Sequence, residues 1–186
     1  ELVHRLVASG ANTRLVGMSP DEIKKIQDSS PEKLATGFGK KYRDQYKRAH
    51  KKFEGISVKE LDVNEVVLLE SRINELYHYV AKNAPFNTFF LAENHFSTFK
   101  KQCGHGFKIF GYFLDEKLVG FHSVLLNDLV LETYFLGYDD QVQKDKMLYL
   151  NMLYNMTEFG ITHQFKKIIF GRTALEIKSS IGATPV

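Results

Sequence analysis

Three apolar segments joined by very short connections occupy the centre of this 186-residue chain. They read FKIFGYFL, LVGFHSVLL and LVLETYFLGY, with only DEK and ND between them. Connections of this length join antiparallel neighbours in hairpins, whereas a parallel crossover needs a dozen or more residues. Residues 107–138 are therefore predicted to form a three-strand antiparallel meander. Because the third segment is apolar at successive positions, we expect a strand that is covered on both faces.

Helical patterns lie on both sides of this meander. Upstream, apolar residues recur at steps of three and four between Val66 and Val80, which is the spacing of one helix face, and residues 94–104 are a shorter helix candidate. Downstream, residues 145–160 are apolar nearly all round, as in a buried helix. The segment FKKIIFG at 165–171 reads as a strand, so the helix before it is predicted to be a crossover that makes the last strand pair parallel.

These elements predict an α/β (α+β) fold, with a mixed sheet that contains the antiparallel meander, a crossover helix and flanking helices. Residues 1–52 are predicted to form a helical lead-in, and residues 53–186 the main domain, which opens with the strand-like KFEGISVKEL.

Cysteine content and motif searches exclude several classes of protein. A single cysteine, Cys103, rules out an intramolecular disulfide framework and favours a cytoplasmic location. No apolar run approaches the roughly 18 residues of a membrane span. There is no cysteine pair, no HExxH motif and no glycine-rich phosphate loop, so we expect neither a metal site nor a nucleotide loop.

The net charge of +3 is small, but the basic residues are unevenly placed. Seven of the thirteen residues in KKYRDQYKRAHKK, at 40–52, are Lys or Arg, and a helical wheel gathers the apolar residues on the opposite side. One interpretation is a solvated face of a helix that packs on the core. The other is a surface for tRNA or another anionic ligand. The residues that would make this contact are Lys40, Arg43, Lys47, Arg48 and Lys51.

Glu132 is a chemical candidate because it lies in the middle of the third apolar strand. Alternation places it on one face with Tyr134, Leu136 and Tyr138. A carboxylate there is desolvated unless it is paired or neutral, which favours a general base. The structural alternative is a Glu132 bonded to a neighbouring strand, for instance to His122. Three residues near it are predicted to bind substrate: Tyr134, Tyr138 and His122.

The last segment, FGRTALEIKSSIGATP at 170–185, contains further charged candidates. Thr173 and Glu176 have the spacing of a capping box, and Gly182 suits the left-handed end of a short helix. These roles do not explain Arg172 and Lys178, each of which is either an exposed charge or a functional group.

The order of elements resembles the acyl-CoA N-acyltransferase fold of the GNAT superfamily. Within that superfamily, FGRTALEIKSSIGATP is similar to the ending of the Fem-type aminoacyl transferases and their BioF2-like acetyltransferase relatives, in which a strand ends in glycine and a lysine follows. The KKYRDQYKRAHKK segment also resembles the basic segment that precedes their transferase domain. The resemblance covers roughly residues 32–185.

This resemblance implies an N-acyltransferase that moves an acyl or aminoacyl group from acyl-CoA or aminoacyl-tRNA to an amine. Lys178 would stabilise the oxyanion, Glu132 would be the general base, and Arg172 would anchor a substrate anion. The cofactor arm would lie beyond Leu136, Gly137 and Tyr138. Its pyrophosphate would lie at a helix start formed by Gln143, Lys144 and Lys146.

The sequence departs from the family pattern in three places. The segment DDQVQKDKM has no glycine of the phosphate loop, and Ile177 stands where an aromatic residue is usual. Further strands would be expected after Val186, so either the chain is truncated or the lead-in supplies the missing piece. The alternative function is therefore a catalytically inactive GNAT-like module whose basic helix docks an anionic partner.

Overall fold

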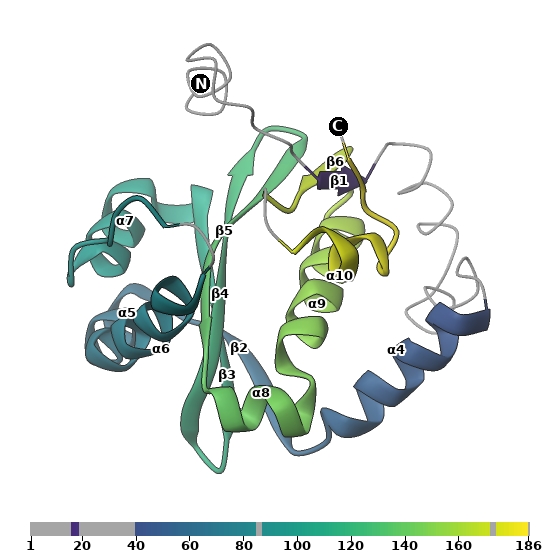
Figure 1. Ribbon diagram of the computed structural model, residues 1–186. Coiled ribbons are helices and arrows are strands. Elements are labelled where there is room, and N and C mark those ends of the chain that lie inside the picture. Colours follow the sequence, from purple (N-terminus) through teal and green to yellow (C-terminus); the bar gives the residue numbers. More distant parts are fainter. Residues whose placement is uncertain (1–15, 19–39, 85–86, 172–173, 186) are drawn as a thin grey trace.

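The structure is a computed structural model that describes residues 16–18, 40–84, 87–171 and 174–185 (Figure 1). In these residues seven strands form one sheet in the order β2-β3-β4-β5-β6-β1-β7. The strands are β1 (Val16–Met18), β2 (Ile56–Glu60), β3 (Phe107–Leu114), β4 (Lys117–Asn127), β5 (Val130–Tyr138), β6 (Lys167–Ile169) and β7 (Thr184–Pro185). The helices are α4 (Lys40–Lys52), α5 (Val63–Leu68), α6 (Glu70–Asn83), α7 (His95–Cys103), η1 (Gly104–Gly106), α8 (Asp140–Lys146), α9 (Leu148–Thr162) and α10 (Leu175–Ser179).

The predicted meander is confirmed, because β3, β4 and β5 pair antiparallel in sequence order. Asp115 and Glu116 join the first two strands with φ of 47° and 63°, the left-handed pair that a two-residue hairpin requires. β5 and β6 are parallel, as predicted from the crossover, and α8 and α9 connect them. The mixed sheet and its flanking helices match the predicted fold class.

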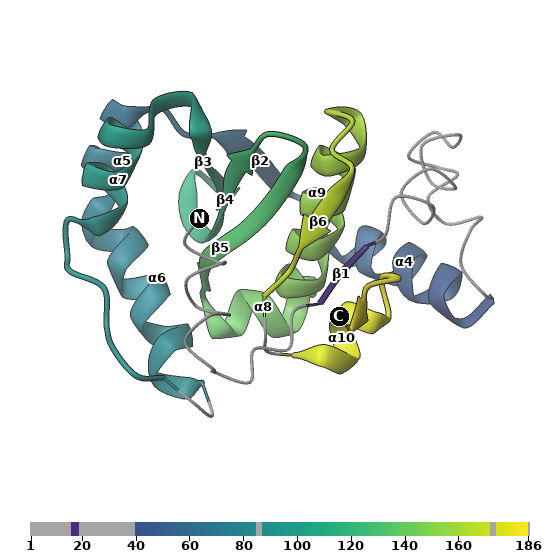
Figure 2. The same cartoon turned by 90° about the horizontal axis from the view of Figure 1, so that it is seen from above.

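Helices cover both faces of the sheet (Figures 1 and 2). α5, α6 and α7 lie on one face, over an apolar cluster that includes Tyr77, Phe96 and Phe121. α9 lies on the other face, over a cluster that includes Tyr112 and Leu131. The central strands therefore bury side chains in two directions, which explains why the sequence of β5 lacks a polar face.

The lead-in contributes to the same core. β1 pairs antiparallel with β6 and with β7, so Val16–Met18 supplies a strand of the sheet. α4 is tied to α9 by Asn151, whose Nδ2 donates to the carbonyl of Ala49 at 3.1 Å and also to the carbonyls of Lys146 and Met147. Segment 1–52 thus adds a strand and a helix to the fold of residues 53–186.

Candidate functional site

The sheet opens at one point, where β5 and β6 separate. Only three residue pairs join these strands, and the last of them is Glu132 with Ile169. Residues 133–138 of β5 continue without a partner on β6. The unpaired edge leaves backbone donors and acceptors available to a ligand. This opening is called the β5–β6 mouth below.

Lys178 lies beside the β5–β6 mouth. Its Nζ donates to the carbonyl oxygen of Phe170, at 2.5 Å, and Phe170 directly follows the last paired residue of β6. The side chain is 4% exposed, and burial lowers its pKa from 10.5 to about 8. The interpretation of Lys178 as an exposed charge is therefore wrong. Its role in catalysis stays a prediction.

Glu132 does not share that environment. Its neighbours across the sheet are Leu125 and Ile169, and Leu125 belongs to the cluster under α5–α7, so Glu132 points toward the face opposite α9. Its Oε1 accepts a hydrogen bond from Asn127 Nδ2 at 3.3 Å in an exposed position. Glu132 is half-buried, and the proposed bond to His122 is wrong, because His122 Nδ1 faces Tyr112; the role of Glu132 as a general base stays a prediction. Glu132 and Lys178 lie on opposite faces of the sheet.

A β-bulge in β5 explains why the predicted face was wrong. Val124 opposes Thr133 and His122 opposes Leu136, so β5 has one extra residue over this interval. Tyr134 and Phe135 both pack into the cluster under α5–α7. After the bulge, the side chains of β5 that simple alternation assigns to one face of the sheet lie on the other face.

The predicted substrate residues are consequently separated. Leu136 and Tyr138 pack against the α9 cluster. Tyr134 lies on the other face, where its Oη shares a hydrogen bond of 3.1 Å with His95 Nε2. Burial raises the pKa of Tyr134 and lowers that of His95. His122 lies on the α9 face, where its Nδ1 is 2.8 Å from Tyr112 Oη. The prediction that these residues share one site is wrong.

Gly137 has a packing role. A Cβ on this residue would lie 2.4 Å from the backbone carbonyl carbon of Leu76 and 2.5 Å from the amide nitrogen of Tyr77. Glycine is therefore required for α6 to approach β5 this closely. Gly137 contacts a helix here, and cofactor binding by Leu136 and Gly137 remains a prediction.

A carboxylate occupies the start of α8, at the corner between β5 and α9. The carboxylate of Asp139 caps α8 by accepting from the amide nitrogens of Gln141, at 3.1 Å, and Val142. Gln143, Lys144 and Lys146 lie in the middle and last turn of α8, directly before α9 begins at Leu148, and binding of a pyrophosphate by them stays a prediction.

These three side chains also have partners within the fold. Gln143 Oε1 accepts from the amide nitrogen of Tyr149, Lys144 pairs with Asp140, and Lys146 Nζ donates to the carbonyl of Glu54. The carboxylate of Asp139 thus already uses amide donors at the start of α8 that a phosphate would need.

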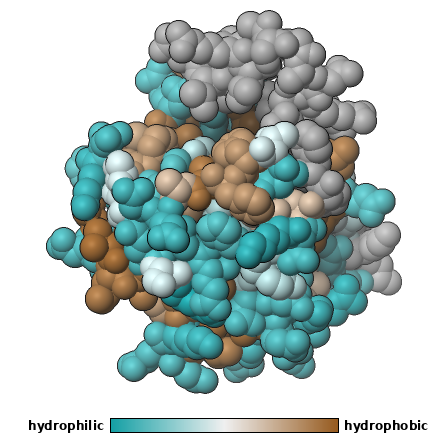
Figure 3. Space-filling model, turned by 60° about the vertical axis from the view of Figure 1, so that its left-hand side comes forward, coloured by the Kyte–Doolittle hydropathy of each residue, from teal (hydrophilic) through white to brown (hydrophobic). Residues whose placement is uncertain are grey.

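A groove of about 1030 Å³ lies between α6, the segment before α7 and the end of β5. It was not predicted from the sequence. Five of its lining residues are acidic (Glu70, Glu75, Glu93, Asp139 and Asp140), and two are basic (Arg72 and Lys82). This groove is called the acidic groove below. Figure 3, which brings this side forward, shows apolar residues among mostly hydrophilic ones.

Two buried oxygens of the acidic groove have no hydrogen-bond partner among the described residues: Asn74 Oδ1 and Glu70 Oε1. Asn74 is 8% exposed, and its Nδ2 donates to the carbonyl of Glu93. Unpaired buried acceptors are rare in proteins, and a water molecule or the N–H group of a ligand would satisfy these two. The acidic groove is therefore suited to a ligand that carries N–H groups.

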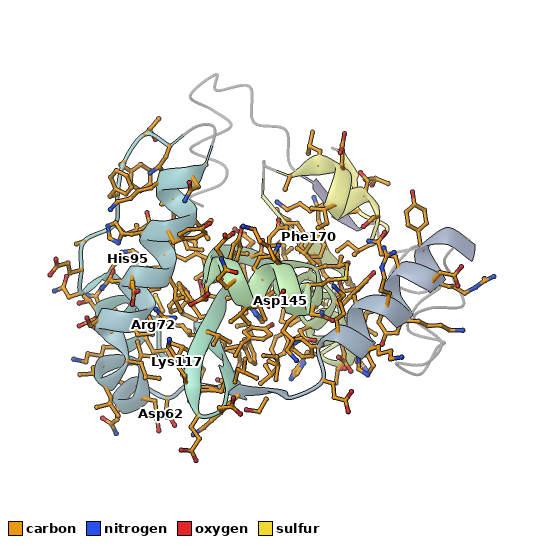
Figure 4. All side chains as sticks on the ribbon, turned by 60° about the horizontal axis from the view of Figure 1, so that its bottom comes forward. Asp62, Arg72, His95, Lys117, Asp145 and Phe170 are labelled. Atoms are coloured by element: carbon orange, nitrogen blue, oxygen red, sulfur yellow. The ribbon has the colours of Figure 1, made fainter. Side chains whose placement is uncertain are left out.

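Arg72 does not neutralise these acceptors, because its guanidinium is already engaged. It donates to the carbonyl of Leu118 at 3.0 Å and to Asp139 at 3.1 Å, and it forms an ion pair with Glu75. Figure 4 shows Arg72 beside the sheet on the α6 side and Phe170 near α10 on the other side. Arg72 thus joins α6 to the end of β5, which shapes the floor of the acidic groove.

The predicted basic helix forms as α4, and Tyr46 and Phe53 pack on the α9 cluster, as the wheel indicated. Lys47, Arg48 and Lys51 are exposed. Binding of tRNA or another anionic ligand by these residues, with Lys40 and Arg43, stays a prediction.

Other predictions concern residues near the end of the chain. Arg172 and Thr173 lie outside the described residues. α10 begins after Ala174, which has φ of 56°, and the capping box of Thr173 and Glu176 stays a prediction. Gly182 has φ of 91°, which confirms the left-handed position predicted for it. In the described part of the chain no group of three or more potential metal ligands occurs. No described helix is long and apolar enough to cross a membrane.

Comparison with solved structures identifies the fold. FemX superposes with a TM-score of 0.71 over 92% of this chain, at 10% identity. L-PGS from Bacillus licheniformis gives 0.51 over 86%, at 13% identity. An aminoglycoside acetyltransferase from an uncultured soil metagenomic sample, in complex with trehalose, gives 0.50 over 67% of this chain and 82% of its own, at 15% identity.

The chain spans 59% of FemX and 46% of L-PGS. No protein-family model matches the sequence, and no curated protein matches it. The described residues have a GNAT-like fold, as the order of elements predicted.

Proposed function

We propose that this chain is an N-acyltransferase domain that moves an aminoacyl group from tRNA to an amine held in the acidic groove. The observation that carries the proposal is the β5–β6 mouth with a buried lysine beside it, in a fold that superposes on FemX with a TM-score of 0.71. Tyr138 ends the unpaired part of β5 and also lines the acidic groove, so one strand connects the two.

The choice of donor rests on the corner after β5. The cap by Asp139 disfavours a pyrophosphate at the start of α8, whereas an aminoacyl ester on tRNA needs no such site. The nucleic acid would instead contact α4, which exposes Lys47, Arg48 and Lys51. Binding of this kind rests on phosphate charge and weakens steeply with salt.

The acceptor is an amine because the acidic groove offers acceptors and negative charge. Asn74 Oδ1 and Glu70 Oε1 would accept the N–H groups of the incoming ammonium or amine. The neutral amine nitrogen then attacks the ester carbonyl. The new C–N bond forms, the ester C–O bond breaks, and one amine proton ends on the released ribose hydroxyl.

Lys178 would stabilise the oxyanion that develops on the carbonyl during this attack. An ammonium has three N–H donors, and the carbonyl of Phe170 takes one of them. A donor in a buried position stabilises such a charge more than one in water does. Loss of a donor of this kind typically lowers the rate by about 100-fold.

The donor is tested by filter binding of mixed aminoacyl-tRNA at increasing salt. Lys47→Ala with Arg48→Ala should weaken binding and reduce the slope of log affinity against log salt by about 1.5. Lys101→Ala with Lys166→Ala removes the same charge from other exposed positions and is the matched control. Equal slopes for the two double variants would refute the role of α4.

Catalysis is tested with the same tRNA, labelled in the aminoacyl group, and cadaverine as the amine. We expect labelled aminoacyl-cadaverine, and about 100-fold less of it from Lys178→Met. Binding of tRNA without transfer would favour the inactive binding module. A rise in melting temperature with millimolar acetyl-CoA would overturn the choice of donor.

A further inference from the structure

A second pocket lies on the α9 face of the sheet, away from the acidic groove. Its volume is about 370 Å³, at the small end of the range for ligand sites. Phe53, Phe110 and Phe159 form apolar walls, and the rings of Phe110 and Phe159 meet edge to face at 5.3 Å. Planar rings pack well against aromatic edges and faces of this kind. This site is called the aromatic pocket below.

A chain of hydrogen bonds at the base of the aromatic pocket fixes the proton positions. Asn155 Nδ2 donates to Tyr112 Oη at 3.2 Å, and the same oxygen is 2.8 Å from His122 Nδ1. The Tyr112 hydroxyl accepts from Asn155, and we assign its own proton to Nδ1, because the opposite tautomer would leave this buried hydroxyl proton without an acceptor among the described contacts. Burial lowers the pKa of His122 to about 3, so the imidazole is neutral and its remaining proton is on Nε2.

His122 Nε2 is buried and has no hydrogen-bond partner among the described residues. His122 lines the aromatic pocket, is 1% exposed, and stacks against Phe110 at 4.9 Å between ring centroids. A buried N–H without an acceptor is costly, and a ligand acceptor would remove the cost. Nε2 itself is closed to solvent, so a ligand acceptor would reach it only when the surrounding side chains move apart.

The rim of the aromatic pocket carries a negative charge, whereas its base offers an N–H donor. Glu158 lines it, is exposed, and has no ion-pair partner in the described part of the chain. Asn155 and Glu158 are three residues apart on α9, so they lie on one face of that helix, about 4.5 Å apart along its axis. No lysine or arginine lines the pocket within the described residues. A cation is therefore favoured at the rim.

We propose that the aromatic pocket binds a planar aromatic amine. The ring would lie between the phenylalanine side chains, a ring acceptor would take the proton of His122 Nε2, and the ammonium would pair with Glu158. This proposal is independent of the transferase proposal, since the aromatic pocket and the acidic groove lie on opposite faces of the sheet.

Three probes test the proposal: 4-(aminomethyl)pyridine has both groups, benzylamine lacks the ring acceptor, and 4-methylpyridine lacks the ammonium. Binding is followed by the ¹⁵N shifts of the histidine side chains. We expect 4-(aminomethyl)pyridine to move the His122 Nε2 signal and to bind about tenfold more tightly than either of the others. Equal affinities, perturbation confined to the acidic groove, or no binding at millimolar concentration would overturn the proposal.

Two variants separate the contacts. His122→Phe should make 4-(aminomethyl)pyridine and benzylamine bind equally, because it removes the donor and keeps the ring. Glu158→Gln should weaken both amines and leave 4-methylpyridine unchanged. Glu158 is exposed, so this variant tests the proposal even if His122→Phe does not fold. Glu176→Gln, an exposed carboxylate on α10, is the control and should change nothing. An unaltered preference in both variants would refute the assigned contacts.

Discussion

Replacing Lys178 by methionine should change how the stability of the protein depends on pH. Burial lowers the pKa of Lys178 from 10.5 to about 8. In the unfolded chain the side chain regains its ordinary pKa. Between these two values the unfolded state binds a proton that the native state does not. The free energy of unfolding must therefore rise as the pH increases through this range, and it is lowest, for this group, below the folded pKa.

The size of the effect follows from the two pKa values. A difference of one pH unit corresponds to about 1.4 kcal/mol when one state binds the proton and the other does not. Integration from pH 7 to pH 9.5 gives about 2 kcal/mol of added stability, because the native lysine still titrates at the lower end. The methionine variant lacks this gain, since it has no group to titrate.

The assay is urea unfolding, followed by circular dichroism, of both proteins between pH 7 and pH 9.5. The quantity to plot is the free energy of unfolding of the parent minus that of Lys178→Met, because all other titrations cancel in this difference. We expect the difference to rise by about 2 kcal/mol across the range. Lys101→Met, at an exposed position on α7, controls for the loss of a lysine. A difference that stays flat would refute the burial of the ammonium.

Three further changes have definite expected outcomes. Gly137→Ala should lower the free energy of unfolding by about 2 kcal/mol, because the new methyl meets rigid backbone of α6, whereas Gly106→Ala, with nothing within 4 Å of its Cβ, should cost little; urea unfolding measures both. Asn151→Leu should cost about 2 kcal/mol, because the carbonyl of Lys146 loses its donor and those of Ala49 and Met147 each lose one of two, and trypsin should then cleave α4 faster. Asp139→Ala should lower the melting temperature by a few degrees, corresponding to about 1 kcal/mol, because α8 loses its cap.

The strand order near the middle of the chain could be predicted from local signals. Turns of two and three residues force antiparallel neighbours, and the long apolar segment 145–160 forces a crossover. These rules depend on chain length and side-chain type, both of which are visible in the sequence. The prediction that Gly182 adopts a left-handed conformation succeeded for the same reason, since a single residue decides it.

The site could not be predicted to the same extent. The bulge in β5 contains Tyr134 and Phe135 and no glycine, so no residue type announces the shift of register that moves later side chains to the other face. The acidic groove combines α6 with the end of β5, which are separated by more than fifty residues. The Asn74 side chain is oriented by the hydrogen bond that its Nδ2 donates to the carbonyl of Glu93, which leaves Oδ1 unpaired. This contact depends on the tertiary structure and is not visible in the sequence.

The placement of β1 has a consequence for the order in which the chain folds. Gly17 pairs with Ile169 and with Thr184, whereas β2–β5 pair with neighbours that are closer in sequence. Closing long loops is entropically unfavourable, so pairings of high sequence separation form late. The pairings of β1 with β6 and β7 should therefore form last and open first. Amide hydrogen exchange in native conditions should find β1 exchanging through partial unfolding while β3 and β4 stay protected.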